Sequence, residues 1–186
     1  GPQLDIEKTI ALNPDLFLTF GMGSPKDDVD KKLVQSTIPI AVSIDHLEET
    51  PLARAEWIKF YAYFFNKETL ADSLFKITEQ KYNELKNIAL QTTKKPSVLT
   101  EIKYGDAWYI PAGKSFIAHL IEDAGGDYFW KEDTKTGSSA QSFETVYAKA
   151  KDCDIWINLY NLNSKKELLS YDERYGLFKA CQNNQL

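Results

Sequence analysis

The sequence contains little of several residue types that particular chemistries require. Its 186 residues include two cysteines, two histidines and one methionine. The cysteines do not form a CxxC or Cys/His zinc pattern, and the two histidines, His46 and His119, are few for a metal site of the His–carboxylate kind. No apolar run approaches the ~20 residues that a helix needs to cross a bilayer. These absences argue against a zinc module, a histidine-rich metal centre and a membrane-spanning helix.

Positive charge is also scarce, because 22 Lys and Arg stand against 27 Asp and Glu, which gives a net charge of −5. Nucleic acid is therefore not an expected partner, since neutralising phosphates requires a basic stripe. Aromatic residues are plentiful, with 10 Phe, 10 Tyr and 4 Trp. Such a chain can bury enough apolar surface to offset its ordering entropy, so we expect one sizeable core or two small lobes.

Short apolar runs alternate with amphipathic segments along the chain. The pattern predicts strands over residues 16–20, 38–44, 98–102 and 154–159, and helices over 6–12, 27–36, 116–124, 143–149, 164–170 and 172–181. The first strand, helix and second strand have the spacing of a βαβ unit, which predicts a parallel sheet. The segment 131–142 is polar and is expected to be a loop.

The segment from Leu52 to Lys95 contains neither Gly nor Pro. Thr50-Pro51 is a good helix start, and Asn66 to Thr69 is the expected break before a second helix over 67–92. That helix would be ~39 Å long, which is more than one small lobe needs. We therefore predict an α/β protein of two Rossmann-like lobes, residues 1–66 and 94–186, joined by a backbone helix over 67–93. Its apolar stripe would contain Leu70, Leu74, Ile77, Leu85 and Ile88.

The two halves of the chain repeat one local arrangement. Glu7 and Glu144 each open a short apolar helix, and Asp15 and Asp154 each introduce a buried strand. An acidic residue in the first turn favours the helix dipole, which is a sufficient local reason for each Glu alone. The repetition itself indicates two lobes of similar plan.

The run from Ile6 to Leu16, IEKTIALNPDL, resembles the "IEKIxALxPDL" signature of helical-backbone (class III) periplasmic binding proteins. Those proteins serve ABC importers for ferric siderophores, haem and cobalamin. The run ETPLARAEWIKF from Glu49 resembles the version common in Bacteroides-type members. The likeness extends from about residue 6 to residue 180. Its second half is carried by Trp108-Tyr109, Gly113-Lys114-Ser115, Ala124-Gly125-Gly126 and Ser142-Phe143-Glu144.

The resemblance implies the function of a transport component. Such a protein captures a ferric siderophore, haem or cobalamin in the cleft between its lobes and delivers it to an ABC permease in the inner membrane. It implies neither enzyme activity nor a cofactor. Family members have more chain at both ends, so we expect a fragment whose lobes are both incomplete. The same comparison implies a periplasmic protein with a lipid anchor on a preceding amino-terminal segment.

In the family, one surface glutamate on each lobe docks against arginines of the permease. By motif position these residues are Glu7 and Glu144, and we expect both to be exposed to solvent. Two charge-assisted contacts, one per lobe, would let the permease sense the separation of the lobes.

Open α/β sheets bind ligands at the carboxyl ends of their strands. In the first lobe Met22 follows such an end, and in the second lobe Tyr104, Trp108, Tyr109 and Lys114 follow another. We favour Trp108 over Tyr109 as the side chain that faces the cleft, with a core position as the alternative. Lys114 or Arg54 would pair with an anionic siderophore, whereas aromatic rings would suit a corrin or haem, and the sequence does not choose.

Two alternatives come from other functional classes. An enzyme on a related two-lobed α/β fold would need a cofactor or a carboxylate pair, and the sequence has no GxSxG, P-loop or HExxH motif. Gly113-Lys114-Ser115 resembles the end of a P-loop, but Trp108 occupies the position of the required glycine. The Tyr and Trp content also suggests a carbohydrate-binding module. A disulfide between Cys153 and Cys181 and the oligomeric state both stay open.

Overall fold

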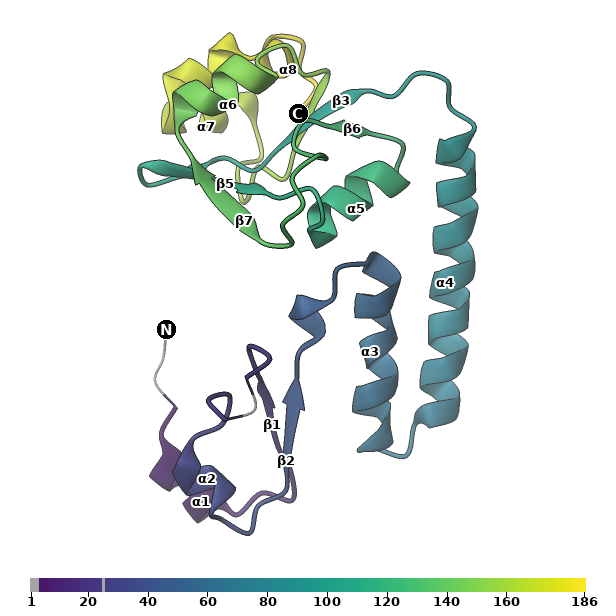
Figure 1. Ribbon diagram of the computed structural model, residues 1–186, viewed down its shortest axis with the longest axis vertical. Helices are drawn as coiled ribbons and strands as arrows, with labels where there is room; N and C mark the ends of the chain where they lie inside the picture. The colour runs from purple at the N-terminus through teal and green to yellow at the C-terminus, as the bar shows by residue number, and fades with distance from the viewer. Residues whose placement is uncertain (1–3, 25) are drawn as a thin grey trace. The chain divides into compact units, whose positions relative to one another are not determined.

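The computed structural model describes residues 4–24 and 26–186 (Figure 1). The chain divides into two compact units, one up to Glu48 and one from Glu49 onward, and each is described by itself. We expected the first lobe to end at residue 66. The structure instead groups helix α3 (Pro51–Tyr63) with the second unit, because α3 packs along helix α4 (Glu68–Leu90).

The first unit is a short βαβ arrangement. Helix α1 (Ile6–Leu12) begins at Asp5, whose carboxylate accepts the Lys8 N–H at 3.0 Å. Strand β1 (Phe17–Phe20) and strand β2 (Ile40–Ser43) pair in parallel, as predicted. Between them helix α2 covers only Lys31–Val34, which is shorter than the predicted helix over 27–36. A 3₁₀ turn, Asp45–Leu47, follows β2.

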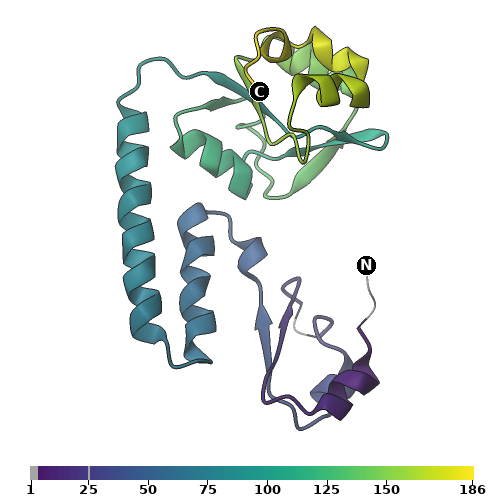
Figure 2. The same cartoon turned by 180° about the vertical axis from the view of Figure 1, so that it is seen from behind.

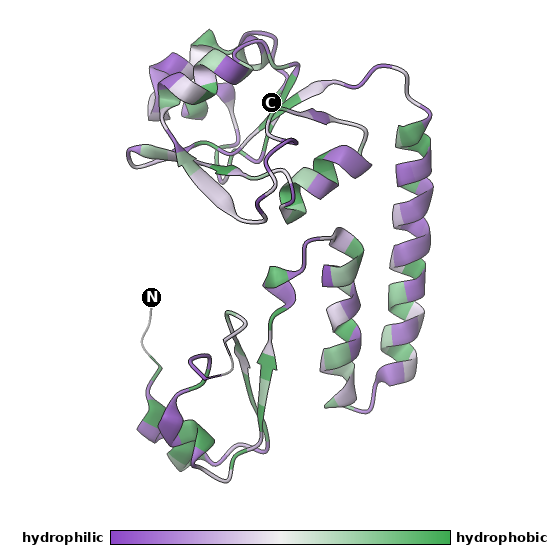
Figure 3. Ribbon diagram, viewed as in Figure 1, coloured by the Kyte–Doolittle hydropathy of each residue, from purple (hydrophilic) through white to green (hydrophobic). Residues whose placement is uncertain are grey.

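Helices α3 and α4 lie side by side and antiparallel in both views of the second unit (Figures 1 and 2). The Thr50 hydroxyl caps α3 by accepting the Ala53 N–H, and Asn66, with φ of 52°, makes the turn between the helices. The long helix predicted over 67–92 is therefore confirmed. Its buried residues are Ala71 and Phe75, whereas the predicted apolar stripe is exposed. Figure 3 shows hydrophobic and hydrophilic segments alternating along α4.

The rest of the second unit contains two three-stranded sheets. In the parallel sheet, β3 (Ser97–Thr100) lies between β6 (Asp127–Tyr128) and β8 (Ile155–Ile157). In the antiparallel sheet, β5 (Ala107–Pro111) lies between β4 (Lys103–Tyr104) and β7 (Ser138–Gln141). Strand β7 falls in the segment 131–142, so the prediction of a loop there is wrong for residues 138–141. Within the described residues no sheet runs through both units, which agrees with the predicted two-lobed plan.

Helices cover these sheets. Helix α5 (Phe116–Asp123) and helix α6 (Phe143–Ala150) both begin at a serine, Ser115 and Ser142, whose hydroxyl accepts an N–H of the first turn. Helix α7 (Lys165–Tyr171) follows β8. The segment predicted as one helix over 172–181 is instead a 3₁₀ helix, Glu173–Leu177, followed by α8 (Lys179–Gln182).

The core of the second unit is strongly aromatic. Trp108 stacks on Trp156 with ring centres 5.5 Å apart, and Phe178 lies 5.0 Å from Trp156. The Trp108 side chain is 0% exposed, and its Nε1–H donates to the Thr100 carbonyl at 3.2 Å. The prediction that Trp108 faces a ligand cleft is therefore wrong. Alternation along β5 turns Trp108 and Ile110 inward and Tyr109 outward.

Cys153 and Cys181 are both buried free thiols. Burial raises the pKa of the Cys153 thiol to about 11, which keeps it protonated and unreactive at neutral pH. Among the helices of residues 4–24 and 26–186, none combines the length and apolarity that a membrane span requires.

Candidate functional site

The carboxyl ends of β3 and β8 form one edge of the parallel sheet, and three unusual residues gather there. Glu101, Asn158 and Tyr160 follow these strands with φ angles of 65°, 58° and 54°. Residues other than glycine rarely adopt this left-handed backbone region. Adopting it costs of order 1–3 kcal/mol per residue. Such strain gathers where function requires a particular geometry. We call this place the β3/β8 edge.

Glu101 is the centre of the β3/β8 edge, and it is only 8% exposed. Its carboxylate accepts a hydrogen bond from the Asn158 side-chain amide. Its backbone carbonyl accepts the Trp156 Nε1–H at 2.7 Å. Burial raises the pKa of Glu101, and the Asn158 amide only partly opposes that shift. Glu101 is therefore a buried carboxyl group that is bound to the segment after β8.

Exposed tyrosines follow Glu101 and Asn158 at this edge. Tyr160, two residues after Asn158, is 60% exposed. Tyr171, which is also exposed, stacks parallel to the buried Tyr175 with ring centres 6.4 Å apart. The Tyr175 hydroxyl accepts the Lys103 N–H at 3.0 Å, which ties these rings to the start of β4.

The two cations next to these rings already have a partner. The Lys103 Nζ lies 3.7 Å from the Asp172 carboxylate, and the Arg174 guanidinium binds the same carboxylate through two hydrogen bonds of 2.9 and 2.7 Å. These contacts hold the pKa of Asp172 below its usual range, with the Arg174 hydrogen bond as the main cause. The β3/β8 edge is therefore aromatic, and the two cations beside it share the Asp172 carboxylate, with the Glu144 carboxylate 3.6 Å from the Arg174 guanidinium.

The residues predicted for the second lobe lie in several places. Tyr104 is exposed in β4 and directly follows Lys103, near the β3/β8 edge. Tyr109 is exposed on β5 of the other sheet. Lys114 lies in the loop before α5, where its N–H donates to the Lys135 carbonyl at 3.0 Å. The structure thus does not bring the predicted set together with Glu101.

Sequence reasoning did not find Glu101, Asn158 or Tyr160. The usable signal was the run NLYNLNS from Asn158, which directly follows a buried strand. Asparagine tolerates the left-handed region better than most residues, so such a run marks a tight turn at a strand end. The pairing of Asn158 with Glu101 joins residues 57 positions apart and has no local signature.

In the first unit, the Met22 loop follows the carboxyl end of β1. The Asp28 carboxylate accepts the Met22 N–H at 2.6 Å and the Ser24 N–H at 2.9 Å. A side chain at Gly21 would approach Asp28 Oδ2 to 2.4 Å, so only glycine fits. Met22 and Phe20 are exposed, and the His46 ring meets Phe20 edge-on at 6.1 Å. This loop is thus a fixed apolar surface at the strand ends.

Glu7 and Glu144 are both exposed, as predicted, with side-chain exposures of 85% and 75%. The Glu7 carboxylate lies 3.4 Å from the Lys32 Nζ, and the Glu144 carboxylate lies 3.6 Å from the Arg174 Nη1. Exposed ion pairs of this kind contribute little, typically ~0–1 kcal/mol. Both carboxylates therefore remain accessible to another cation.

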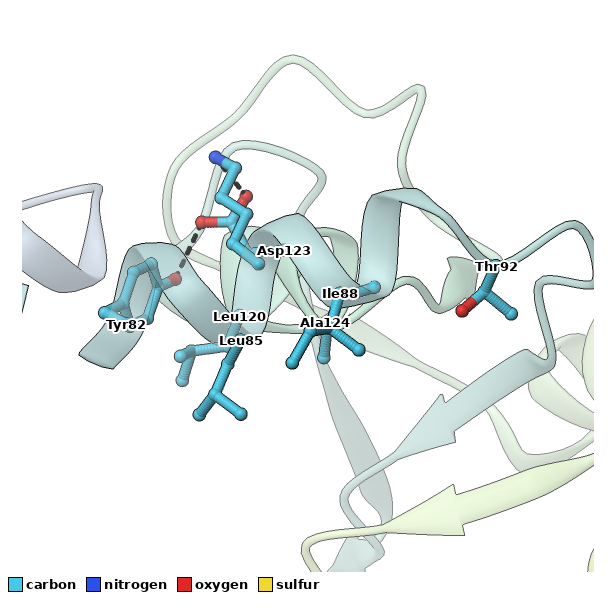
Figure 4. Close-up of a pocket in the computed structure, with 9 residues that line it drawn as sticks. Tyr82, Leu85, Ile88, Thr92, Leu120, Asp123 and Ala124 are labelled. Atoms are coloured by element: carbon cyan, nitrogen blue, oxygen red, sulfur yellow. Dashed lines mark hydrogen bonds and ion pairs between the residues drawn. The ribbon is translucent and has the colours of Figure 1, made fainter. Parts of the chain in front are cut away.

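A pocket of about 480 Å³ lies between α4 and α5 (Figure 4). Asp123 is among the residues that line it. Its carboxylate accepts a hydrogen bond from the Tyr82 hydroxyl at 2.7 Å and forms an ion pair with the Lys86 Nζ at 2.6 Å. Burial and this carboxylate raise the pKa of Tyr82. These contacts connect α4 to α5. The apolar part of the pocket lining consists of Leu85, Ile88, Ala89, Leu120 and Ala124. Among the described residues, no group of three His, Cys, Asp or Glu is arranged to hold a metal ion.

Comparison with curated proteins finds similar chains in Methanocaldococcus jannaschii. An uncharacterized lipoprotein is 31% identical over 183 residues, which is 97% of this chain and 43% of the lipoprotein. A second uncharacterized protein is 27% identical over 190 residues, which is 98% of this chain and 56% of that protein. The chain thus spans about half the length of the curated relatives it matches.

Three solved structures share the fold. The haem-binding protein HutB of Vibrio cholerae matches with a TM-score of 0.73 at 20% identity, covering 98% of this chain and 70% of HutB. A possible iron-binding protein of Staphylococcus epidermidis matches with a TM-score of 0.70 at 18% identity. The match covers 98% of this chain and 69% of that structure. The vitamin B12 binding protein BtuF of Vibrio cholerae matches with a TM-score of 0.67 at 16% identity. The match covers 98% of this chain and 68% of BtuF.

The model of the family described as periplasmic binding protein matches residues 1–186. The solved structures above share the fold of this chain over 98% of its length. This chain belongs to the periplasmic binding protein family.

Proposed function

We propose that this chain is part of the substrate-binding component of an ABC importer. The component captures a ferric siderophore, haem or cobalamin between its lobes and delivers it to a permease in the inner membrane. The observation that carries the proposal is the β3/β8 edge, where the buried Glu101 binds Asn158 and Tyr160 is exposed, at the carboxyl ends of parallel strands. That is the place where open α/β sheets bind ligands. The family match and the iron, haem and B12 binding named for the similar structures support it.

The two units offer related surfaces for a ligand. Met22 and Phe20 are exposed at the strand ends of the first unit, and Tyr160 and Tyr171 are exposed at those of the second. Apolar and aromatic walls with a few fixed polar groups are typical of small-molecule sites. Tyr104, Tyr109 and Lys114, all exposed, remain candidate contacts for the same ligand.

Docking to the permease is assigned to Glu7 and Glu144. Each carboxylate is exposed and weakly paired, so an arginine of the permease can replace Lys32 or Arg174 at little cost. In the native-length protein, Glu7→Ala combined with Glu144→Ala should weaken transport and leave ligand affinity unchanged. Transport in vesicles and ligand titration on the same variant measure the two effects. If the double variant loses ligand affinity, the docking assignment is wrong.

The family and one relative support a proposal for the location of the protein. We propose a periplasmic protein that is lipid-anchored through an amino-terminal segment, because the 31% identical relative is named a lipoprotein. Metabolic labelling of the host with an alkyne fatty acid should mark the protein. If the fatty acid labels other proteins of the cells but not this one, the proposed lipid anchor is wrong.

Native mass spectrometry of the protein purified from its host tests the proposed function most broadly, because it gives the mass of a bound ligand. Titrations with haemin, cyanocobalamin, ferric enterobactin and oligosaccharides then compare the ligand classes. Micromolar or tighter binding of one metal chelate is expected. Binding of oligosaccharides alone would instead support a carbohydrate-binding module, which the number of exposed tyrosines favours as the second candidate.

A further inference from the structure

We propose that an exposed apolar stripe on α4 is an internal contact of the native-length protein, and that a helix from the part of the chain after residue 186 covers it. This stripe, which we call the α4 stripe, consists of Leu70, Leu74, Ile77, Leu85 and Ile88. The inference goes beyond the proposed function, because it concerns how the protein is assembled around its long helix and does not depend on which ligand binds.

Helix α4 has a wider apolar face than its described neighbours cover. Its buried residues are Ala71 and Phe75, and the Lys59 Nζ of α3 lies over the Phe75 ring, 4.3 Å from its centre. At about 100° per residue, the α4 stripe lies roughly 100° around the helix from these two residues. The residues of the stripe are between 44% and 68% exposed. Among the residues that the structure describes, α4 therefore has a partner for only part of its apolar face.

The α4 stripe borders a groove of the kind that a third helix fills. Leu85 and Ile88 line the pocket of about 480 Å³ together with Leu120 and Ala124, and Figure 4 shows these four side chains gathered along one side of the two helices. Side chains of one helix pack into the grooves of its neighbours. From Leu70 to Ile88 the stripe is about 18 residues or ~27 Å long, which is the length of a helix rather than of a small ligand.

The chain itself is long enough to supply this helix. The match to the archaeal lipoprotein covers 97% of this chain but only 43% of the lipoprotein, and the match to HutB covers 98% of this chain and 70% of HutB. Relatives that share this fold therefore contain further chain. An exposed apolar stripe of this length is typical of a surface that another part of a protein covers.

The position of Gln185 favours the chain after residue 186 over the chain before residue 1. Gln185 belongs to the same unit as α4, and its carbonyl accepts the Trp156 N–H of β8 at 3.0 Å. Strand β8 pairs with β3, which begins at Ser97, shortly after α4 ends at Leu90. A chain that continues from Gln185 thus starts about two strand spacings, or ~10 Å, from β3 and can lie along α4 without leaving the unit.

Lys81 favours the same chain over a second copy as the partner. It lies on the α4 stripe, one helical turn from Ile77 and one from Leu85. Two copies packed stripe against stripe would bring their Lys81 side chains together, because Lys81 is close to the middle of the stripe. Like charges in an interface disfavour such a dimer. A helix of the same chain can instead place an acidic side chain opposite Lys81.

Leu85→Gln in the native-length protein tests whether the α4 stripe is covered. Leu and Gln have similar helix propensities, so the change removes apolar contact without weakening the helix. The melting temperature should fall by about 5–10 °C, as it does when a buried leucine is lost from a protein of this size. The matched control is Leu90→Gln, because Leu90 is 65% exposed against 68% for Leu85 but lies off the stripe. It should change the melting temperature by less than about 2 °C. Equal melting temperatures of the two variants would overturn the inference.

A carbodiimide, which joins amines to carboxylates in contact, identifies what covers the stripe. In the ligand-free native-length protein it should join Lys86 to Asp123, whose charged groups lie 2.6 Å apart, and this link is the internal control. It should also join Lys81 to an acidic residue that follows residue 186, which peptide mass spectrometry detects. A mixture of normal and isotope-labelled protein distinguishes links within one chain from links between copies.

The inference is overturned if Lys81 is linked to a second copy or to a segment that precedes Gly1. It is also overturned if the link between Lys86 and Asp123 forms and no link from Lys81 leaves residues 1–186. Neither experiment uses a ligand, so these outcomes leave the proposed function untouched, and a failure of chelate binding would leave this inference standing.

Discussion

The two units follow the same β-then-α plan but differ in how much core they bury. In the first unit the buried apolar residues among those described are Leu33, Ile38 and Ala41, while Phe20 and Met22 are exposed. The second unit buries Trp108, Trp156, Tyr175, Phe178 and many aliphatic residues in one continuous cluster. Aromatic side chains bury 150–250 Å² each, so the second unit has much the larger driving force for folding.

Because the first unit buries few apolar residues and the second buries many, the two units should differ in stability. A two-stranded parallel sheet is too small to be stable by itself, and parallel sheets normally have both faces covered. The first unit therefore opens more easily than the second. The second unit, by contrast, can support the strained backbone of Glu101, Asn158 and Tyr160 because its core over-determines their position.

Replacement of Trp108 by alanine should have the largest effect. The residue is fully buried against Trp156, Phe143 and Phe178, so its removal should cost ~3–5 kcal/mol of unfolding free energy. Denaturant titration followed by near-UV circular dichroism measures the loss. Tyr109→Ala, one residue away and exposed, is the control and should stay within ~0.5 kcal/mol of the wild type. Equal effects of the two variants would contradict the placement of the core.

Leu33→Ala tests whether the first unit unfolds separately. Leu33 is the most buried large side chain there, and its truncation should cost ~2–5 kcal/mol within that unit. Hydrogen exchange should then accelerate in β1 and β2, while β3 and β8 keep their protection. If hydrogen exchange accelerates equally in both sheets, the two units unfold together and the proposed difference in their stability is wrong.

Asp123→Asn should have a smaller effect on the attachment of α4 to α5. The carboxylate serves both Tyr82 and Lys86, and hydrogen bonds to charged groups contribute ~1.5–3 kcal/mol. A drop of that order in unfolding free energy is expected. Asp72→Asn, which alters an exposed pair with Lys59 at 3.6 Å, should leave the denaturation midpoint unchanged. If both variants melt like the wild type, the network does not stabilise the helix pair.

Glu101 should give the smallest and most specific effect, a dependence of stability on pH. Its pKa is raised in the folded protein, so the native state holds the proton more tightly than the unfolded state. The stabilising contribution is complete below the ordinary Glu pKa and is lost as the pH rises through the raised value. Glu101→Gln should remove this loss, so its melting temperature should exceed that of the wild type by more at pH 7 than at pH 4. A constant difference would show that Glu101 does not titrate as inferred.

Local signals predicted most of the elements. Thr50 and Pro51 start α3 as predicted, and α5 ends at Asp123, one residue before the predicted end, with Gly125 at a φ of 80° two residues after Asp123. The periodicity of α4 correctly grouped Leu70 with Ile88 on one stripe. It could not show that Phe75, beside that stripe, is the residue that packs inward, because periodicity identifies a face and not its partner. Strand β7 was missed because its sequence, Ser-Ser-Ala-Gln, contains no β-branched or aromatic residue, the types that are typical of strands.

The candidate site was harder to predict than the fold. The choice between Trp108 and Tyr109 depends on which neighbour of an alternating pair meets the core, and that is settled by Trp156 and Phe178, far along the chain. Sequence reasoning did not single out Glu101, because its hydrogen-bond partners Trp156 and Asn158 lie 55 and 57 residues away. Glu7 and Glu144 are exposed, as the resemblance to the family implied.

Hydrogen–deuterium exchange on the native-length protein, with and without the chelate that titration shows to bind, tests the central claim most directly. We expect the ligand to protect residues 101–104 and 158–160 of the second unit and residues 20–24 of the first. The segments 67–90 and 143–150 should exchange at the same rate in both states. A bound chelate that leaves residues 101–104 and 158–160 unprotected would contradict the claim that the β3/β8 edge is the ligand surface.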